Sequence, residues 1–287
     1  MANLKEIRSR ITSVGSTMQI TSAMKMVSAA KLKRAQDTVT QMRPYSNKLS
    51  ELLKNLSSSL DSSDGGVYAQ KRKLSNVLLV VITSNRGLCG GFNANILKKT
   101  KELVDVEYKN TKVDILSIGK KSSEYFSKNN YNVIGKHDDL FIDLTYNNTA
   151  NIAEDIMIKF ENCDYDEVVL VYNQFKNAAT QIIMAENFLP IQSETNKDIV
   201  VGDYIFEPQK QQIVEKLIPK SLKTQLFKAV LDSHAAEHGA RMTAMHKATD
   251  NASELKKELT LTYNKARQAA ITGEILEIVG GAEALNS

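Results

Sequence analysis

Apolar residues recur every three or four positions through the first sixty residues. Leu4, Ile7, Ile11, Val14 and Met18 form one stripe, and Leu32, Ala35, Val39, Met42, Leu49, Leu53, Leu56 and Leu60 form a second. The two stripes are out of phase around Met24 and Val27. This spacing predicts a coiled-coil helix with a phase break rather than a surface helix of a compact domain. Pro44 is expected to kink or interrupt it, and the polar segment 57–66 to end it.

The pattern changes between residues 75 and 207, where short β-rich runs alternate with helical stretches. The predicted strands are 77–82, 113–118, 168–172 and 180–184, and the predicted helices are 93–108, 120–128 and 149–161. Asn147, Asn148 and Thr149 are candidate N-caps for the last helix. Alternating strands and helices predict a parallel or mixed sheet with helices packed on it, a Rossmann-like α/β head domain.

After Pro208 the helical spacing returns and continues to the end of the chain. Met245, Ala248, Ala252, Leu255, Leu259, Thr262, Ala266 and Ala269 keep it without a miss. A helix over 220–285 would be about 100 Å long, which is about twice the width of a globular domain of this size. We therefore expect an antiparallel coiled coil of the two terminal helices with the α/β domain inserted between them. The predicted divisions are a first helix (1–60), a linker (61–74), the head (75–207) and a second helix (208–287).

Composition adds few constraints. The 287 residues carry a net charge of +4, and no apolar run approaches the length of a membrane span. The two cysteines, Cys89 and Cys163, have no metal-ligand spacing, which favours free thiols in a reducing compartment. The N-terminal twenty residues share the Arg/Ser-rich, acid-poor character of a mitochondrial presequence. Because their pattern runs unbroken into the next residues, we interpret them as mature protein without a transit peptide.

One motif is typical of metalloproteases. The segment His234-Ala-Ala-Glu237-His238 matches HxxEH, with two histidines one helical turn apart and a glutamate placed as a base. A catalytic zinc also needs a third ligand and a concave pocket. Since the flanking residues continue the coiled-coil pattern, polar positions on a long helix are the preferred interpretation, and we expect no metal.

The turn Arg86-Gly87-Leu88-Cys89-Gly90-Gly91-Phe92 follows a strand and precedes a helix, where a phosphate-binding loop would lie. Its spacing is neither GxGxxG nor GxxxxGK[ST]. The glycines are better explained by a tight turn that needs positive φ or close packing. Cys89 is interpreted as a buried structural thiol, and no cofactor is expected.

The first 36 residues contain seven basic residues against Glu6 alone. A basic helical arm is typical of a solvated helix face, or of a surface that binds nucleic acid or an acidic protein. Without interleaved aromatic residues to stack on bases, an acidic protein partner is favoured over RNA. From the residues alone, three classes remain open: a structural coiled-coil subunit, a nucleotide- or metal-dependent enzyme, and a basic adaptor for nucleic acid.

Four segments resemble the γ subunit of F-type ATP synthases. These are residues 5–36 (KEIRSRI…ITSAMKMVSAAKLKRAQ), 43–49 (RPYSNKL), 85–96 (NRGLCGGFNANI) and 240–284, within which Ile271-Thr272-x-Glu274-x-x-Glu277-x-x-x-Gly281-Ala282 matches the family signature. The resemblance implies a noncatalytic rotor, one copy per complex. Its paired helices would turn inside the α3β3 ring and couple proton translocation to ATP synthesis or hydrolysis.

The resemblance also implies partners and contact residues. The partners are the α and β subunits, the ε subunit and the c-ring of Fo, with no nucleic acid and only indirect membrane association. The location would be peripheral, on the cytoplasmic face of the bacterial inner membrane. The implied rotor–stator contacts are Met24, Lys25, Arg241, Arg267, Gln268, Thr272, Glu274 and Glu277. The foot on the c-ring and ε is implied at Tyr204, Phe206 and Glu207.

Overall fold

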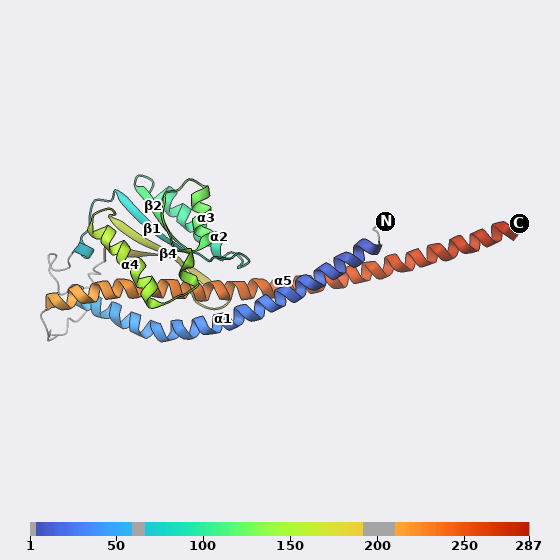
Figure 1. Cartoon of the computed structure of the whole chain (residues 1–287), viewed down its shortest axis with the longest axis horizontal. Helices are drawn as coiled ribbons and strands as arrows, with labels where there is room; N and C mark the ends of the chain where they lie inside the picture. The colour runs from blue at the N-terminus through green and yellow to red at the C-terminus, as the bar shows by residue number, and fades with distance from the viewer. Residues whose placement is uncertain (1–3, 59–66, 192–209, 287) are drawn as a thin grey trace. The chain divides into compact units, whose positions relative to one another are not determined.

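The two ends of the chain form long helices, as the spacing of apolar residues predicts. The computed structural model describes residues 4–58, 67–191 and 210–286. Helix α1 is Leu4–Ser58 and helix α5 is Lys210–Asn286 (Figure 1). The second stripe of α1 is buried along much of its length, at Leu32, Ala35, Val39 and Leu49. The helices therefore form where apolar residues line one side and find a partner.

Pro44 does not interrupt the helix, because α1 runs through it as one helix, and the alternative expectation of a kink there stays a prediction. Proline lacks the amide that would bond to the carbonyl of Thr40, four residues earlier. Thr40 is exposed, so water can satisfy this carbonyl. Pro219 similarly lies inside α5.

Five strands form one sheet in the order β3-β2-β1-β4-β5. The strands are β1 (Asn76–Ile82), β2 (Lys112–Ile118), β3 (Val133–Lys136), β4 (Glu167–Phe175) and β5 (Gln181–Leu189). The first four are parallel, and β5 pairs with β4 antiparallel. Residues 77–82 of β1 are fully buried, as expected for a central parallel strand covered on both faces. The predicted Rossmann-like head is thus confirmed.

Helices cover both faces of this sheet. The helices of the head are α2 (Phe92–Glu102), α3 (Lys120–Lys128) and α4 (Tyr146–Glu161), with short turns η1 (Val67–Ala69), η2 (Leu103–Glu107) and η3 (Asp138–Phe141). One face packs against α2, η2 and α3 through Ile96, Leu103 and Phe126. The other packs against α4 and the first part of α5. In Figure 1, α2 and α3 lie together, away from α4.

Several details of the head differ from the sequence prediction. Helix α4 begins earlier than expected, because Thr145 rather than residues 147–149 is the N-cap: its Oγ1 accepts a hydrogen bond from the Asn148 amide at 3.3 Å. Strand β3 was not predicted. The helix expected over 93–108 is α-helical only to Glu102 and continues as the π-helical turn η2.

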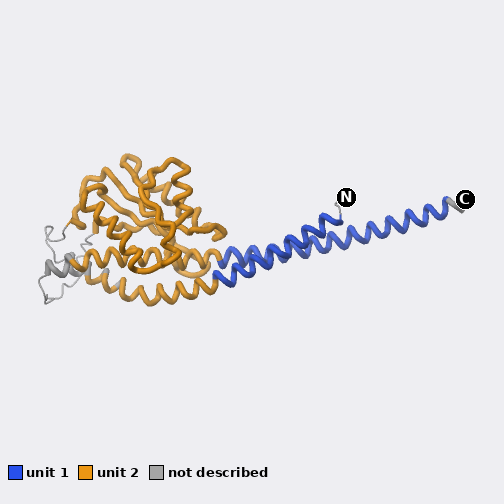
Figure 2. The backbone as a smooth tube through the Cα atoms, viewed as in Figure 1, with its two compact units in different colours: residues 1–28, 242–287 blue, residues 29–241 orange. Residues whose placement is uncertain are grey.

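The chain divides into two compact units, residues 1–28 with 242–287 (unit 1) and residues 29–241 (unit 2) (Figure 2). Helices α1 and α5 both contribute to each unit. In unit 1, Thr249 Oγ1 donates to Thr21 Oγ1 at 2.8 Å, and Lys25 Nζ lies 3.3 Å from His246 Nδ1. A Cβ on Gly15 would lie 3.7 Å from Lys256 Nζ. Partner numbers fall along α5 as they rise along α1, so the helices pair antiparallel, as predicted.

The sequence-based domain boundaries stay a proposal. The linker 61–74 and the junction near residue 207 both involve segments outside the described residues.

Candidate functional site

The residues implied as partner contacts lie on the two long helices. In unit 1, Met24 and Lys25 of α1 are partly exposed, and five residues of α5 are exposed: Arg267, Gln268, Thr272, Glu274 and Glu277. No described residue buries these five side chains. Tyr204, Phe206 and Glu207 lie outside the described residues. The assigned roles of all these residues stay predictions.

The last turns of α5 carry large apolar side chains that are exposed to solvent. The exposed fractions are 48% for Ile271, 55% for Ile275, 66% for Leu276, 71% for Ile278 and 54% for Val279. At about 100° per residue, these five positions span a sector of about 160° around the helix. Glu274 and Glu277 fall outside that sector. An apolar face of this width is typical of a helix that other chains bury.

Arg241, also implied as a partner contact, lies in unit 2 and is buried. Its Nη1 donates to Glu237 Oε1 at 2.5 Å, and its Nη2 donates to the backbone oxygens of Arg86 and Gly87 at 3.1 and 3.3 Å. Burial raises the pKa of Glu237, and the Arg241 guanidinium opposes this rise. Arg241 therefore ties α5 to the β1–α2 loop, residues 83–91.

The two histidines of the HxxEH motif face each other on α5. Their Nε2 atoms are 3.1 Å apart, and the His234 ring stacks on Phe141 of η3. Burial, aided by the positive charges of Lys31 and Arg241, lowers the pKa of His234 to about 4 and that of His238 to about 3. Glu237 bonds to Arg241, and the described residues contain no group of three His, Cys, Asp or Glu side chains arranged to hold a metal.

A second ion pair, between a buried carboxylate and a partly exposed guanidinium, joins the two long helices within unit 2. Arg43 Nη2 of α1 donates to Asp232 Oδ1 of α5 at 3.0 Å and to the Phe175 carbonyl of β4 at 2.9 Å. The Asp232 side chain is fully buried, whereas that of Arg43 is 41% exposed. Burial raises the pKa of Asp232, and Arg43 partly offsets this. One guanidinium thus links α1, β4 and α5.

The glycine-rich β1–α2 loop is a tight turn, as predicted. Gly90 has φ +59°, and the other positive φ in the loop, +62°, falls on Leu88. A phosphate-binding loop presents amides to its ligand, but here two carbonyls face the Arg241 guanidinium. Cys89 is buried, as expected, and burial raises the pKa of its thiol. These contacts support a structural role for the glycines and for Cys89.

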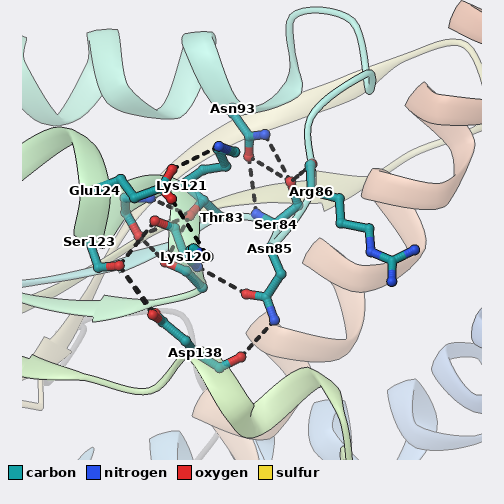
Figure 3. A network of polar contacts seen from close by, with 12 residues as sticks. Thr83, Ser84, Asn85, Arg86, Asn93, Lys120, Lys121, Ser123, Glu124 and Asp138 are labelled. Carbon is teal, nitrogen blue, oxygen red and sulfur yellow. Dashed lines mark hydrogen bonds and ion pairs between the residues drawn. The ribbon is translucent and has the colours of Figure 1, made fainter.

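Polar side chains at the carboxyl ends of β1 and β2 bond mainly to one another (Figure 3). Asn85 Oδ1 accepts from the Lys120 amide at 2.9 Å, and its Nδ2 donates to the Asp138 carbonyl at 2.6 Å. Asn93 Oδ1 accepts from the amide of Ser84 at 3.0 Å. This is the edge where open α/β sheets bind ligands, and here these groups fasten the loops that follow β1, β2 and β3.

The ties made by Arg43, Asp232, Glu237 and Arg241 inside this chain were not predicted. A signal was present, since Asp232 follows the apolar residues 229–231 of α5, where an unpaired carboxylate would be costly, and Glu237 stands four residues before Arg241, the spacing of a helical ion pair. Arg43, the partner of Asp232, and the loop carbonyls bonded by Arg241 lie far away in sequence and could not be read from the pattern.

The fold defines a class of protein in which an α/β domain is inserted between paired terminal helices. Comparisons with known proteins show which family of this class the chain belongs to. A family model described as ATP synthase matches residues 3–285. The chain is 62% identical to the ATP synthase gamma chain of Flavobacterium johnsoniae, with both chains covered completely. It also resembles two solved chains of the Euglena gracilis mitochondrial ATP synthase. One, from the OSCP/F1/c-ring structure in rotational state 3, has a TM-score of 0.69 at 24% identity, covering 98% of this chain and 94% of that one. The other, from the rotor in rotational state 1, has a TM-score of 0.64 at 22% identity, covering 93% and 98%.

The chain belongs to the ATP synthase gamma chain family. The resemblance read from the four sequence segments is thereby confirmed. The likeness to the Euglena structures supports the fold. Within the described residues, no helix is both long and apolar enough to cross a membrane.

Proposed function

We propose that this chain is the noncatalytic central-stalk rotor of an F-type ATP synthase. The observation that carries the proposal is the apolar end of α5, where Ile271, Ile275, Leu276, Ile278 and Val279 are exposed in the chain alone. Their burial by a surrounding ring of α and β subunits would stabilise the complex. Each fully buried side chain of this size contributes about 1.5–3 kcal/mol.

In this proposal the α3β3 ring holds the nucleotide sites, and rotation of the asymmetric shaft biases each site in turn. The shaft can bias a nucleotide site only if the free energy of its contacts with the ring differs between the conformational states of that site. Met24, Lys25, Arg267, Gln268, Thr272, Glu274 and Glu277 are the proposed contacts with the ring, and Arg241 contributes by holding α5 to the head.

We also propose that Tyr204, Phe206 and Glu207 contact the c-ring and ε. One copy per complex would then sit peripherally at the cytoplasmic face of the bacterial inner membrane, attached through the c-ring. No cofactor, metal or nucleic acid takes part in the proposed role. The enzyme and nucleic-acid alternatives predict stoichiometric binding of ATP or zinc, or salt-sensitive binding of duplexes, by the purified chain.

The test is affinity purification of the native complex through a tag on this chain. We expect α, β and ε subunits and the c-ring to copurify, with one tagged chain per complex. The double variant Ile275→Asp, Leu276→Asp should lose the α and β subunits while the isolated chain keeps its unfolding midpoint, because these side chains are exposed. The control Ile142→Asp, which places the same charge at an exposed apolar position of the head, should keep the α and β subunits. Tight ATP or zinc binding by the isolated chain, or full assembly of the double variant, would contradict the proposal.

A further inference from the structure

The histidine pair of α5, in which His238 is buried and His234 is partly buried, is a polar feature that the rotor role does not use. His234 and His238 lie one helical turn apart in unit 2, with Nε2 atoms 3.1 Å apart and ring planes at 83°. At this separation the two nitrogens can share one proton. His238 is 5% exposed, and its Nδ1 is buried without a hydrogen-bond partner among the described residues. The pair is therefore packed in a setting suited to neutral rings.

The groups around the pair are unfavourable to added positive charge. Phe141 of η3 stacks on the His234 ring at a centroid distance of 5.9 Å, and offers no counter-charge. Lys31 of α1 and Arg241 of α5 both act on the two rings with positive charge. Glu237, the nearest carboxylate in sequence, bonds to Arg241 and also interacts with Lys31 and Arg86. None of the charged groups that perturb the pair, within the described part of the chain, is a carboxylate.

We propose that His234 and His238 form an acid-sensitive latch, which is closed while both rings are neutral and opens locally when they take up protons. In the closed state the two rings of α5 pack beside Phe141 of η3 and lie within the electrostatic reach of Lys31 of α1. In the open state, residues 231–241 of α5 separate from that packing, and water solvates the imidazolium groups.

The direction of the effect follows from linkage. The pKa of His234 is about 4 in the closed state against an ordinary 6.5, so the open state binds more protons between these values. The closed state is therefore fully favoured above pH 6.5, and its stability relative to the open state decreases as the pH falls toward 4. For this histidine alone, the open:closed ratio should be about 20-fold larger at pH 5 than at pH 7. His238 adds to this in the same direction.

Hydrogen exchange on the full-length chain tests the latch. Amide exchange would be followed by mass spectrometry in peptides covering residues 231–241 at pH 7 and pH 5, after correction for the intrinsic pH dependence of exchange. We expect protection in this segment to fall at least about 10-fold at pH 5 in the native chain. The variant with His234→Gln and His238→Gln should lose most of this pH dependence, while His246→Gln, which alters an exposed histidine, should keep it.

A second variant covers the case in which the double substitution does not fold, as judged by circular dichroism at pH 7. His238→Gln alone should then reduce the pH-dependent loss of protection, because only His234 remains to titrate. The proposal is overturned if the native segment is equally protected at pH 5 and pH 7. It is also overturned if the folded variants lose protection on acidification as the native chain does.

Discussion

Asp232 shows how one buried charge is held by a distant residue. Its side chain has no exposed surface, and Arg43, its ion-pair partner, also bonds to the Phe175 carbonyl. Removing one member of a buried pair leaves the other desolvated, which costs more than the pair itself contributes. The arginine is partly solvated and Asp232 can take up a proton, so the cost should fall below that of a fully buried pair.

We expect Arg43→Met to lower the free energy of unfolding by about 2–3 kcal/mol at pH 7. Urea denaturation of the full-length chain measures this. The matched control is Lys33→Met, which breaks an exposed pair with Asp37 in the same helix and should cost no more than about 0.5 kcal/mol. Equal effects of the two substitutions would show that the Arg43 pair is not a structural tie.

Gly119 is a residue whose backbone admits no side chain. It follows β2 with φ +104°, and a Cβ there would lie 2.2 Å from the Thr83 carbonyl oxygen. Both the conformation and the backbone contact exclude an L-residue without a shift of β1 or β2.

Gly119→Ala should therefore destabilise the chain by at least about 3 kcal/mol or prevent soluble expression. The control is Gly273→Ala, where a Cβ in α5 meets nothing within 4 Å and should stabilise the helix by up to about 1 kcal/mol. Thermal unfolding of both variants would compare them. A Gly119→Ala chain with native stability would refute the described turn.

At the scale of elements, the sequence predicts what periodicity controls and misses what tertiary contacts control. The long helices and β1 follow from apolar spacing: β1 is buried from residue 77 to residue 82, and each long helix keeps an apolar stripe, which the end of α5 leaves exposed. Strand β3 has only four residues, none fully buried, so no apolar run marks it. Strand β5 extends to Leu189 although only 180–184 was predicted, because Glu186 and Asn187 interrupt its apolar pattern. In the structure these two side chains bond to Tyr172, Gln225 and the Pro190 carbonyl.

The candidate site was predictable in part for the same reason. The resemblance to the family assigns the contact residues through sequence motifs. The hydrogen bonds between α5 and the head, in contrast, depend on which side chains of α5 lie beside the β1–α2 loop in the folded chain. Arg241 is the clearest case: the motif marks it as a partner contact, whereas in this chain it is buried against two loop carbonyls.

A double-mutant cycle on Arg241 and Glu237 tests the buried ion pair within α5 that holds the Arg241 guanidinium beside the β1–α2 loop. Arg241→Gln leaves Glu237 unpaired and should cost about 3 kcal/mol. Adding Glu237→Gln removes that unpaired charge, so the double variant should be more stable than additivity predicts by about 1–3 kcal/mol. Chemical denaturation gives the four stabilities, and strict additivity would contradict the ion pair.

For the whole molecule, family membership and the exposed end of α5 lead to the same account. The chain belongs to the ATP synthase gamma chain family, and its last helix carries apolar residues that it does not bury itself. The head is fastened to α1 and α5 within unit 2 by Arg43 and Arg241. Such ties are what a shaft needs to transmit torque between the head and its helices.

Observation of rotation in a single assembled complex tests this account most directly. Cys163 is exposed and Cys89 is buried, so a probe attached through Cys163 would report the orientation of the head. With the α3β3 ring fixed to a surface through subunits that lack reactive thiols, ATP should drive continuous rotation of the probe in one direction, and rotation should stop when ATP is removed. A complex that hydrolyses ATP at a normal rate while the probe stays stationary would contradict the rotor function.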